Sequence, residues 1–534
     1  MTREVADAVV VGGGHHALVA AAELADAGWD VVVLERADRV GGAVASREVD
    51  GWVLDEFSAC HPLGLASPVL QGLELEREGL RWSHAPSPVT HVASPDDELG
   101  SAVLDDPAAT AALLDEDCPG DGRAWLRLCE DYAALREPLW RALLTRWPPS
   151  AGVLPLLRRV GARHLPDLAR FALLPASRMG EELFEGRRGR DLLAGNAMHA
   201  DIPADAPGSG MYGWLMTMLS QDVGFPSATG GTAQLARALR SRAERAGARV
   251  ETGVDVVRIR VADGRAQAVE TADGRVVRAR RAVIASTSAP DLYGRLLDPA
   301  DVPAGLTARM RRFVWDLPTV KLNYRLTAPM PWRAARAHGA GVVHVGRDLP
   351  GLVRWSADLD SGRVPEAPFA LVGQMATIDP GRAPAGGESL WLYTHLPRGV
   401  TDGEAVRTTT ERCEAMLDGL APGWRDLVVG GWRQAPADLE AADPNLGDGG
   451  VAGGTMQLYQ QAIWRPSTGL GGPRTHVAGL YLGSAAVHPG GGVHGAGGHL
   501  AARLALHDAR WWSRPMARAG LGVTRALQET PPRW

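Results

Sequence analysis

The stretch DAVVVGGGHHALVAAAELADAGWDVVVLE, residues 7–35, contains the pattern that decides the fold. Its first five residues predict a buried strand, and the segment 30–34, DVVVL, predicts a second. Between them, three glycines predict a tight turn, and the alanine-rich segment 18–27 predicts a helix that ends at Gly28. A strand, a glycine turn, a helix and a second strand in this order predict a βαβ unit.

The glycine turn has the form G-x-G-x-x-A, with Gly12, Gly14 and Ala17 at its fixed positions. The first glycine allows the turn, the second lets the backbone approach a pyrophosphate, and the small third residue lets helix and strand pack closely. Glu35 ends the second strand about 20 residues later, where a carboxylate can accept both hydroxyls of an adenosine ribose. The unit therefore predicts a Rossmann-type dinucleotide site.

A second glycine pair follows Glu35 and indicates which dinucleotide is bound. Gly41 and Gly42 bring further backbone amides towards the diphosphate, and Arg39 can add a charge-assisted contact. This E-x5-G-G arrangement resembles flavoproteins of the glutathione-reductase-like superfamily, which includes amine oxidases and phytoene desaturases. The resemblance implies that the cofactor is FAD.

The stretch GLYLGSAAVHPGGGVHGAGGH, residues 479–499, is the most specific part of the chain. It predicts a strand that enters a glycine-rich turn and opens a helix through 500–506. The free amides at such a helix start, and the positive end of its dipole, suit the flavin pyrimidine carbonyl and the reduced anion. With the N-terminal fingerprint and the strand 320–326, it resembles the phytoene desaturase-like branch of FAD-dependent oxidoreductases. One departure is Gly483-Ser484, where relatives often have Cys-Gly or Ala-Gly.

The resemblance also implies which residues border FAD. A glycine turn, a helix over 233–246 and three strands between 250 and 285 return the chain to the flavin domain. Val256 is expected to contact adenine through its main chain. The expected FAD residues are Gly12, Gly14, Ala17, Glu35, Arg36, Arg39, Gly41, Gly42, Val256, Ser286, Gly483, Ser484, Gly491, Gly492 and Val493.

These motifs divide the chain into a discontinuous FAD domain and a substrate domain. The expected fold class is α/β: a Rossmann-type FAD domain with a β-meander, plus a mixed α+β substrate domain with a helical portion. The boundaries are 1–70, 225–290 and 475–510 for the FAD domain, 71–224 for a helical substrate or cap region, 291–474 for the substrate domain and 511–534 for a C-terminal tail.

Composition narrows the class of function. The 56 basic and 62 acidic residues give a net charge of -6, so we expect no nucleic-acid partner. The four cysteines form no C-x-x-C pair, and we expect no metal site and no disulfide-reductase chemistry. The chain shows no signal peptide pattern and no long apolar run, which predicts a cytoplasmic protein. Helices over 153–174 carry arginines beside apolar faces, and a peripheral membrane contact is the alternative to a solvated face there.

Three side chains are candidates for catalysis: Lys321, His61 and His488. Lys321 is the only lysine among the 56 basic residues, and it shares one face of a strand with Asn323 and Arg325. In the amine oxidase relatives a lysine on the corresponding strand approaches the flavin N5 through a water, and the VKLN segment is similar. A buried lysine can titrate, and a salt-bridging lysine is the alternative. Both histidines are expected near the flavin, where orienting the turn is the alternative to proton transfer.

These features predict that bound FAD takes a hydride or its equivalent from a hydrophobic, polyene- or isoprenoid-like small molecule in bacterial secondary metabolism. We expect this substrate to reach the flavin through a tunnel between 71–224 and 291–474. Three alternatives stay open: a redox-neutral isomerase or cyclase that uses reduced FAD, an amine oxidase, and a non-catalytic FAD-binding scaffold. The sequence does not identify the electron acceptor.

Overall fold

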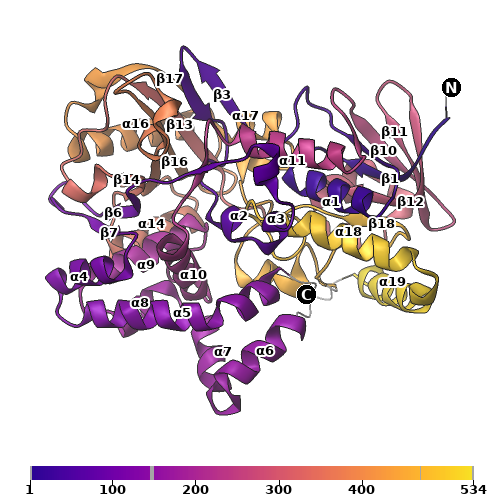
Figure 1. Ribbon diagram of the computed structural model, residues 1–534, viewed down its shortest axis with the longest axis horizontal. Coiled ribbons are helices and arrows are strands. Elements are labelled where there is room, and N and C mark those ends of the chain that lie inside the picture. The colour runs from indigo at the N-terminus through magenta and orange to yellow at the C-terminus, as the bar shows by residue number, and fades with distance from the viewer. Residues whose placement is uncertain (1–2, 145–149, 470, 532–534) are drawn as a thin grey trace.

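The chain forms two main parts, each built on a seven-stranded sheet. The structure is a computed structural model, and it describes residues 3–144, 150–469 and 471–531. In Figure 1 the two sheets lie side by side, with the helices of the first half of the chain below one sheet and the C-terminal helices against the other. Segments from both ends of the sequence meet in the nucleotide-binding part.

The first sheet has the strand order β10-β11-β12-β1-β2-β9, and β18 pairs with the end of β12. β1 runs parallel to β12 and β2, whereas β10, β11 and β12 form an antiparallel meander. This arrangement confirms the expected Rossmann-type fold with its meander. The bounds are β1 (Arg3–Val11), β2 (Val31–Leu34), β9 (Arg249–Glu251), β10 (Val256–Ala262), β11 (Arg265–Thr271), β12 (Val276–Ala285) and β18 (Leu480–Leu482).

Three helices cover this sheet: α1 (His15–Asp26), α11 (Ala233–Arg245) and α18 (Ala496–Ala509). Small side chains line α1, and its alanines are buried against the sheet and α18. A Cβ on Gly498 would lie 1.8 Å from the His16 carbonyl oxygen, so α18 can approach α1 this closely only with a glycine there. The two predicted sequence signatures are thus in direct contact.

The second sheet has the order β17-β13-β16-β15-β14-β6-β7. The segment 71–224, expected to be a helical substrate or cap region, is not helical throughout, because β6 and β7 come from it. β6 is parallel to β14, with Val89 opposite Val342, so the segment completes the substrate sheet. The bounds are β6 (Ser87–Val92), β7 (Ser101–Val103), β13 (Thr319–Leu326), β14 (Ala340–Val345), β15 (Ala370–Gln374), β16 (Glu388–His395) and β17 (Val428–Gln434).

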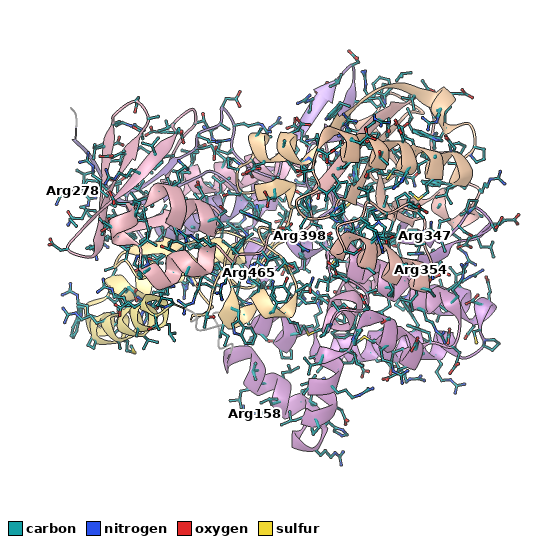
Figure 2. The ribbon with its side chains drawn as sticks, turned by 180° about the vertical axis from the view of Figure 1, so that it is seen from behind. Arg158, Arg278, Arg347, Arg354, Arg398 and Arg465 are labelled. Atoms are coloured by element: carbon teal, nitrogen blue, oxygen red, sulfur yellow. The ribbon has the colours of Figure 1, made fainter. Side chains whose placement is uncertain are left out.

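The helices of 107–222 pack beneath the second sheet (Figure 1). Trp125, Leu128 and Tyr132 are buried on one face of α5, as their spacing predicts. α6 and α7 project from the body, and Arg158 lies on this projecting arm in Figure 2. The bounds are α4 (Pro107–Asp117), α5 (Asp121–Leu143), α6 (Ser150–Val160), α7 (Leu165–Leu173), α8 (Ala176–Leu183), α9 (Arg187–His199) and α10 (Ser209–Asp222).

Shorter elements connect the two parts, and the expected C-terminal tail contains a helix, α19. No described helix is long and apolar enough to cross a membrane. The described residues hold no cluster of three or more potential metal ligands. The remaining bounds are β3 (Ser46–Val49), β4 (Trp52–Asp55), α2 (Pro62–Ala66), α3 (Pro68–Gln71), β5 (Trp82–Ser83), β8 (Ser227–Ala228), α12 (Ala289–Asp291), α13 (Ala304–Met310), α14 (Leu349–Asp360), α15 (Met375–Ile378), α16 (Gly403–Leu420), α17 (Pro436–Ala442) and α19 (Arg514–Glu529).

Candidate active site

The first glycine turn lies between β1 and α1 and leaves room for a phosphate. Gly12 has φ +91°, and a Cβ there would lie 3.1 Å from the Ser286 carbonyl oxygen. Gly14 is the N-cap of α1 without a side-chain cap, and no other described segment comes within 4 Å of where its Cβ would stand. The first amides of α1 thus have no side-chain cap and lie at the positive end of the helix dipole, which suits a pyrophosphate.

Glu35 and the second glycine pair close around this turn. The Glu35 carboxylate accepts hydrogen bonds from the amides of Gly13, at 2.5 Å, and Ala37, at 2.8 Å. The Gly41 amide donates to the Gly13 carbonyl at 2.9 Å, and Gly41 has φ +119°. The acid expected to bind the ribose thus lies over the turn, and its two oxygens keep further lone pairs for hydroxyl groups.

The two arginines after Glu35 are engaged within the protein. Arg36 donates to the Ala441 carbonyl at 3.2 Å, and Arg39 forms an ion pair with Glu56 at 2.7 Å. The Arg39 side chain is 45% exposed, so opening this pair costs at most about 1 kcal/mol. Contact of either arginine with FAD stays a prediction.

Three further predicted residues lie around the turn. Ala17 is fully buried on α1, as close helix packing requires. Ser286 follows β12 and donates its amide to the Val11 carbonyl at 2.9 Å, which places its own carbonyl against the first glycine. Val256 begins β10, and its carbonyl accepts a hydrogen bond from Arg295 at 3.3 Å. Main-chain contact of Val256 with adenine stays a prediction.

The C-terminal strand enters its turn through Gly483 and Ser484. A Cβ on Gly483 would lie 2.9 Å from the Ile284 side chain and 3.0 Å from Ala501, so this glycine lets α18 pack onto β12. The Ser484 hydroxyl donates to the Thr287 carbonyl at 2.6 Å. Gly483, where relatives often have cysteine or alanine, is therefore required for helix packing, and Ser484 connects the turn to the segment after β12.

The glycines of the C-terminal turn pack against both parts of the chain. A Cβ on Gly491 would lie 2.8 Å from Ala452, and one on Gly492, which has φ +116°, would lie 2.7 Å from the Leu63 side chain. The Val493 carbonyl oxygen lies 3.0 Å from where a Cβ on Gly64 would stand. The predicted C-terminal turn and the segment after β4 are therefore brought together.

A segment that the sequence analysis placed in the substrate domain also reaches the nucleotide turn. The Asp443 carboxylate lies 3.0 Å from the position of a Cβ on Gly42. Burial raises the pKa of Asp443, and the nearby Glu35 carboxylate adds to this effect. Asn445 accepts a hydrogen bond from the Ser288 amide at 2.6 Å. No local pattern indicates this return, because it depends on the chain folding back after α17.

Arg465 holds the loop behind the C-terminal turn. Its guanidinium donates to the carbonyls of Ala485 and Ala452, each at 2.9 Å, and lies 3.1 Å from where a Cβ on Gly490 would stand. Burial lowers the pKa of Arg465 to about 10. Figure 2 shows Arg465 near the middle of the view, between the two halves of the molecule. Arg465 therefore stabilises the C-terminal turn by binding backbone carbonyls of the neighbouring loops.

Histidines from three segments gather beside the glycine turns: His15, His16, His61, His488 and His494. The ring centroids of His15 and His16 lie 4.0 Å apart, and those of His16 and His494 lie 5.3 Å apart. Burial lowers the pKa of His15, His61 and His488 to about 4 and that of His494 to about 3, so these rings are neutral at physiological pH.

The cluster has ring nitrogens that are available to a bound group. Nε2 of His15 and Nδ1 of His61 are buried without a hydrogen-bond partner among the described residues. Buried polar atoms of this kind call for an explanation, and a ligand that hydrogen-bonds to them provides one. His61 and His488 were predicted here, whereas His15 and His494 were not. Their places within the two glycine motifs were the signal that could have identified them.

Lys321 is buried on β13 at the junction of the two parts. Its ammonium donates to the carbonyls of Asp55, at 2.5 Å, and Phe57, at 3.0 Å, and lies 5.9 Å from the centre of the Trp391 ring. Burial lowers the pKa of Lys321 to about 8. The segment that binds Lys321 ends at His61, whose Nε2 lies 3.3 Å from the Ser58 hydroxyl. The segment 55–61 therefore connects two of the three predicted catalytic residues: it ends at His61, and its carbonyls bind Lys321.

A fully buried ion pair supports this segment and was not predicted. Arg382 donates to the Asp55 carboxylate at 2.8 Å, and both side chains are completely shielded from solvent. The Thr232 amide donates to the same carboxylate at 3.0 Å, and Arg382 also reaches the Ser227 hydroxyl at 2.7 Å. The pair joins the β3–β4 hairpin, the start of α11 and the substrate sheet around Lys321.

A small pocket lies between the helical segment and the second sheet. It has a volume of about 10 Å³ and is lined by Met198, Leu317, Trp355 and a buried pair, His395 and Asp201. Burial alone would lower the pKa of His395, but the Asp201 carboxylate at 2.8 Å outweighs this and raises it. The pocket has room for one water at most, so a tunnel for a large substrate stays a prediction.

The residues around the two turns fit an FAD molecule. Two uncapped helix starts and the glycines of the two turns provide the donors and space that a dinucleotide needs. Glu35 lies over the first turn, and Nε2 of His15 and Nδ1 of His61 are unpaired among the described residues. The fold and this site define a flavin-dependent oxidoreductase. The chain belongs to the family of flavin containing amine oxidoreductases, whose sequence profile matches residues 18–505.

Individual relatives agree with this assignment. The chain is 29% identical to "Pyridine nucleotide-disulfide oxidoreductase domain-containing protein 2" of Rattus norvegicus, over 94% of this chain and 93% of that one. It is 26% identical to a zeta-carotene-forming phytoene desaturase of Myxococcus xanthus, over 91% and 90% of the two chains. A solved structure of a putrescine oxidase variant superposes with a TM-score of 0.60 at 16% identity, covering 97% of this chain and 100% of that one, and shares the fold. The protein is an FAD-dependent oxidoreductase, and the resemblance to phytoene desaturase-like flavoproteins is confirmed.

Proposed function

We propose that the protein dehydrogenates an apolar, polyene- or isoprenoid-like molecule by removing two hydrogens. When bound, FAD supplies the redox chemistry by accepting a hydride equivalent. The glycine turns and Glu35 position the cofactor, and two side chains are placed to assist: His61 on the segment 55–61 and Lys321, which binds that segment from β13. The acceptor that reoxidises the flavin is left open.

The electrostatic character of the site carries this proposal. The histidines at the two turns are neutral, the Asp55 carboxylate is paired with Arg382, and the Lys321 ammonium is bound by two carbonyls. The carboxylates of 55–61 are paired with arginines, Asp55 with Arg382 and Glu56 with Arg39 and Arg47, so this segment leaves no free carboxylate to pair with an ammonium group of a substrate. Burying an unpaired charged group is costly, whereas an apolar molecule avoids this penalty. An apolar substrate suits such a site best.

Lys321 and His61 have complementary roles in the proposed reaction. A pKa of about 8 allows Lys321 to give and regain a proton near neutral pH, which suits a group that serves a flavin ring nitrogen. His61 is neutral and has a free Nδ1, so it can donate or accept one hydrogen bond without bringing charge to the site. Neither role requires the substrate to carry a polar group.

The relatives support a substrate of this chemistry and also indicate the alternative. The Myxococcus relative is named as a phytoene desaturase that forms zeta-carotene, and it matches nine-tenths of the chain. The putrescine oxidase shares the fold at low sequence identity, so an amine remains the second candidate substrate. The alternatives differ in what reduces the flavin.

Anaerobic mixing of the FAD-loaded protein with a substrate panel tests the proposal. The panel contains linear polyenes and monoterpenes in detergent micelles, polyamines and aromatic monoamines. We expect a polyene or terpene to bleach the oxidised flavin spectrum and to yield a product with two fewer hydrogens. Bleaching by an amine alone would identify an amine oxidase. Conversion of an apolar compound to an isomer without net flavin reduction would identify an isomerase or cyclase, and no reaction across the panel would favour a scaffold.

A further inference from the structure

Tyr393 lies directly opposite Lys321 on the second sheet. The two residues are partners in the antiparallel pairing of β16 with β13, so their side chains leave the same face of the sheet. Trp391 and His395 lie on that face as well, and their ring centres are 5.9 and 5.7 Å from the ring centre of Tyr393. In Figure 1 α9 and α14 lie beneath this sheet, and Asp201, which follows α9, binds His395. The face therefore extends from Lys321 to the helical segment.

The hydroxyl group of Tyr393 has no hydrogen-bond partner among the described residues. Tyr393 is half-buried, whereas its neighbours in β16, Leu392 and Thr394, are buried. Burial and the nearby Asp201 carboxylate raise the pKa of Tyr393, so its hydroxyl keeps its proton. Tyrosine hydroxyls inside proteins usually form hydrogen bonds. A bound molecule can supply the partner that the protein does not.

Asp201 has a second polar atom that is open to a bound molecule. Its side chain is 6% exposed, and one carboxylate oxygen accepts a hydrogen bond from Nε2 of His395 at 2.8 Å. Among the described residues, none donates to the other oxygen. Asp201 and His395 both line the small pocket between the helical segment and the sheet. One donor, on Tyr393, and one acceptor, on Asp201, are thus unused on this side of the sheet.

The carboxylates of this region already have cationic partners. Asp201 is paired with His395 and raises its pKa, which favours the charged imidazole. The buried Asp316 lies near Arg465, whose pKa of about 10 keeps it protonated. An ammonium group bound here would therefore meet a carboxylate that is already neutralised. A neutral group that both donates and accepts hydrogen bonds suits the region better.

We infer that Tyr393 and Asp201 bind a hydroxyl group of the substrate, which is then an apolar alcohol and not a plain hydrocarbon. The hydroxyl oxygen accepts a hydrogen bond from Tyr393, and the hydroxyl proton is donated to the free oxygen of Asp201. His395 is a positioning residue that orients the Asp201 carboxylate. This alcohol is the molecule dehydrogenated in the proposed function, on which the inference therefore rests.

Anaerobic titration of the FAD-loaded protein tests the inference, because flavin absorbance reports both binding and reduction. The compounds are geraniol and geranylgeraniol, the two matching amines and the two hydrocarbons that lack the end group, all in the same detergent micelles. We expect an alcohol to bind roughly tenfold more tightly than its hydrocarbon and its amine. Equal affinity for alcohol and hydrocarbon, or no binding of either alcohol, would overturn the inference. Bleaching of the flavin by an amine alone would instead contradict the proposed function.

Three variants show whether the named side chains cause the preference. Tyr393→Phe should weaken binding of the alcohol roughly three- to tenfold and leave binding of the hydrocarbon unchanged, because only a hydroxyl is lost. His395→Gln removes the cationic partner of Asp201 and should shift the ratio of amine to alcohol affinity roughly tenfold towards the amine. Tyr324→Phe is the matched control, since the Tyr324 hydroxyl donates to Glu414 at 2.7 Å on the opposite face of the sheet. An unchanged alcohol affinity in Tyr393→Phe, or an equal loss in the control, would overturn the inference.

Discussion

At the scale of single residues, the buried ammonium of Lys321 is the group whose protonation matters most to the site. Lys321 keeps an ammonium in the interior because two backbone carbonyls accept its protons, while burial lowers its pKa to about 8. An arginine at this position would stay protonated at every pH at which the protein is folded. This difference explains how the one lysine of the chain can serve a proton-transfer role that none of its arginines can.

Lys321→Met should leave FAD bound but slow flavin reduction or reoxidation, because the site loses its titratable donor. Stopped-flow measurement of both half-reactions checks this, with FAD content measured on the same sample. His61→Ala in the same assay shows whether the neighbouring histidine contributes separately. Unchanged rates of both half-reactions in Lys321→Met would return the lysine to a purely structural role.

Lys321 should also affect stability at alkaline pH. Its pKa is lowered from 10.5 to about 8 in the folded protein, so between these values the unfolded chain binds more protons than the folded one. The free energy of unfolding should therefore rise with pH across this window, by about 3 kcal/mol in total. Urea unfolding of wild type and Lys321→Met at several pH values isolates the effect. Parallel pH profiles for the two proteins would show that the lysine titrates normally.

At the scale of elements, the local pattern predicted the βαβ unit and the C-terminal glycine turn, and it missed the segments that pack around them. The strand, turn and helix at 7–35 were predictable because glycine positions and apolar runs act within a few residues. Strands β6 and β7 were missed, since β6 pairs with β14, more than 200 positions away, and β7 joins the sheet only through β6. Asp443 and the Asp55–Arg382 pair were missed for the same reason: nothing in their neighbouring residues indicates a distant contact.

The contact between α1 and α18 should be the most sensitive to side-chain size. Gly498→Ala places a methyl group where the His16 carbonyl now lies, so the two helices must separate. We expect a loss of about 1–3 kcal/mol in unfolding free energy, and weaker FAD binding because both glycine turns shift. Thermal unfolding with and without added FAD measures both effects.

Gly522→Ala is the matched control for that experiment. Gly522 lies within helix α19, and no described atom outside its own stretch of helix comes within 4 Å of the position of a Cβ. Alanine should stabilise this helix by up to about 1 kcal/mol, because glycine is the poorer helix former. An equal loss of stability in both variants would mean that the α1–α18 contact is no more sensitive to an added methyl group than the exposed side of α19.

At the scale of the whole molecule, buried polar contacts join the two parts around the flavin site. The Asp55–Arg382 pair connects the hairpin after the nucleotide unit to the substrate sheet, and Lys321 binds the same segment from β13. Buried pairs of this kind contribute little net stability, but removing one partner leaves the other charge unpaired. The junction is therefore a place where single substitutions have large effects.

Arg382→Met should lower the free energy of unfolding by about 3–5 kcal/mol, because the Asp55 carboxylate stays buried without its partner. Adding Asp55→Asn should recover part of the loss. Arg47→Met removes an exposed ion pair with Glu56 and should cost less than about 1 kcal/mol. Chemical denaturation of the four proteins provides the comparison, and a loss in Arg382→Met no larger than that in Arg47→Met would contradict a structural role for the buried pair.

If turns from both ends of the chain build one FAD site, the purified protein should bind flavin, and its flavin content is the measurement to make. Visible absorbance after incubation with FAD and removal of the excess should show wild type carrying an equimolar amount of flavin. Glu35→Ala should carry less, because the loss of charged hydrogen-bond acceptors, worth about 1.5–3 kcal/mol, weakens binding roughly tenfold or more. A wild-type protein that stays colourless and takes up no FAD would contradict the account.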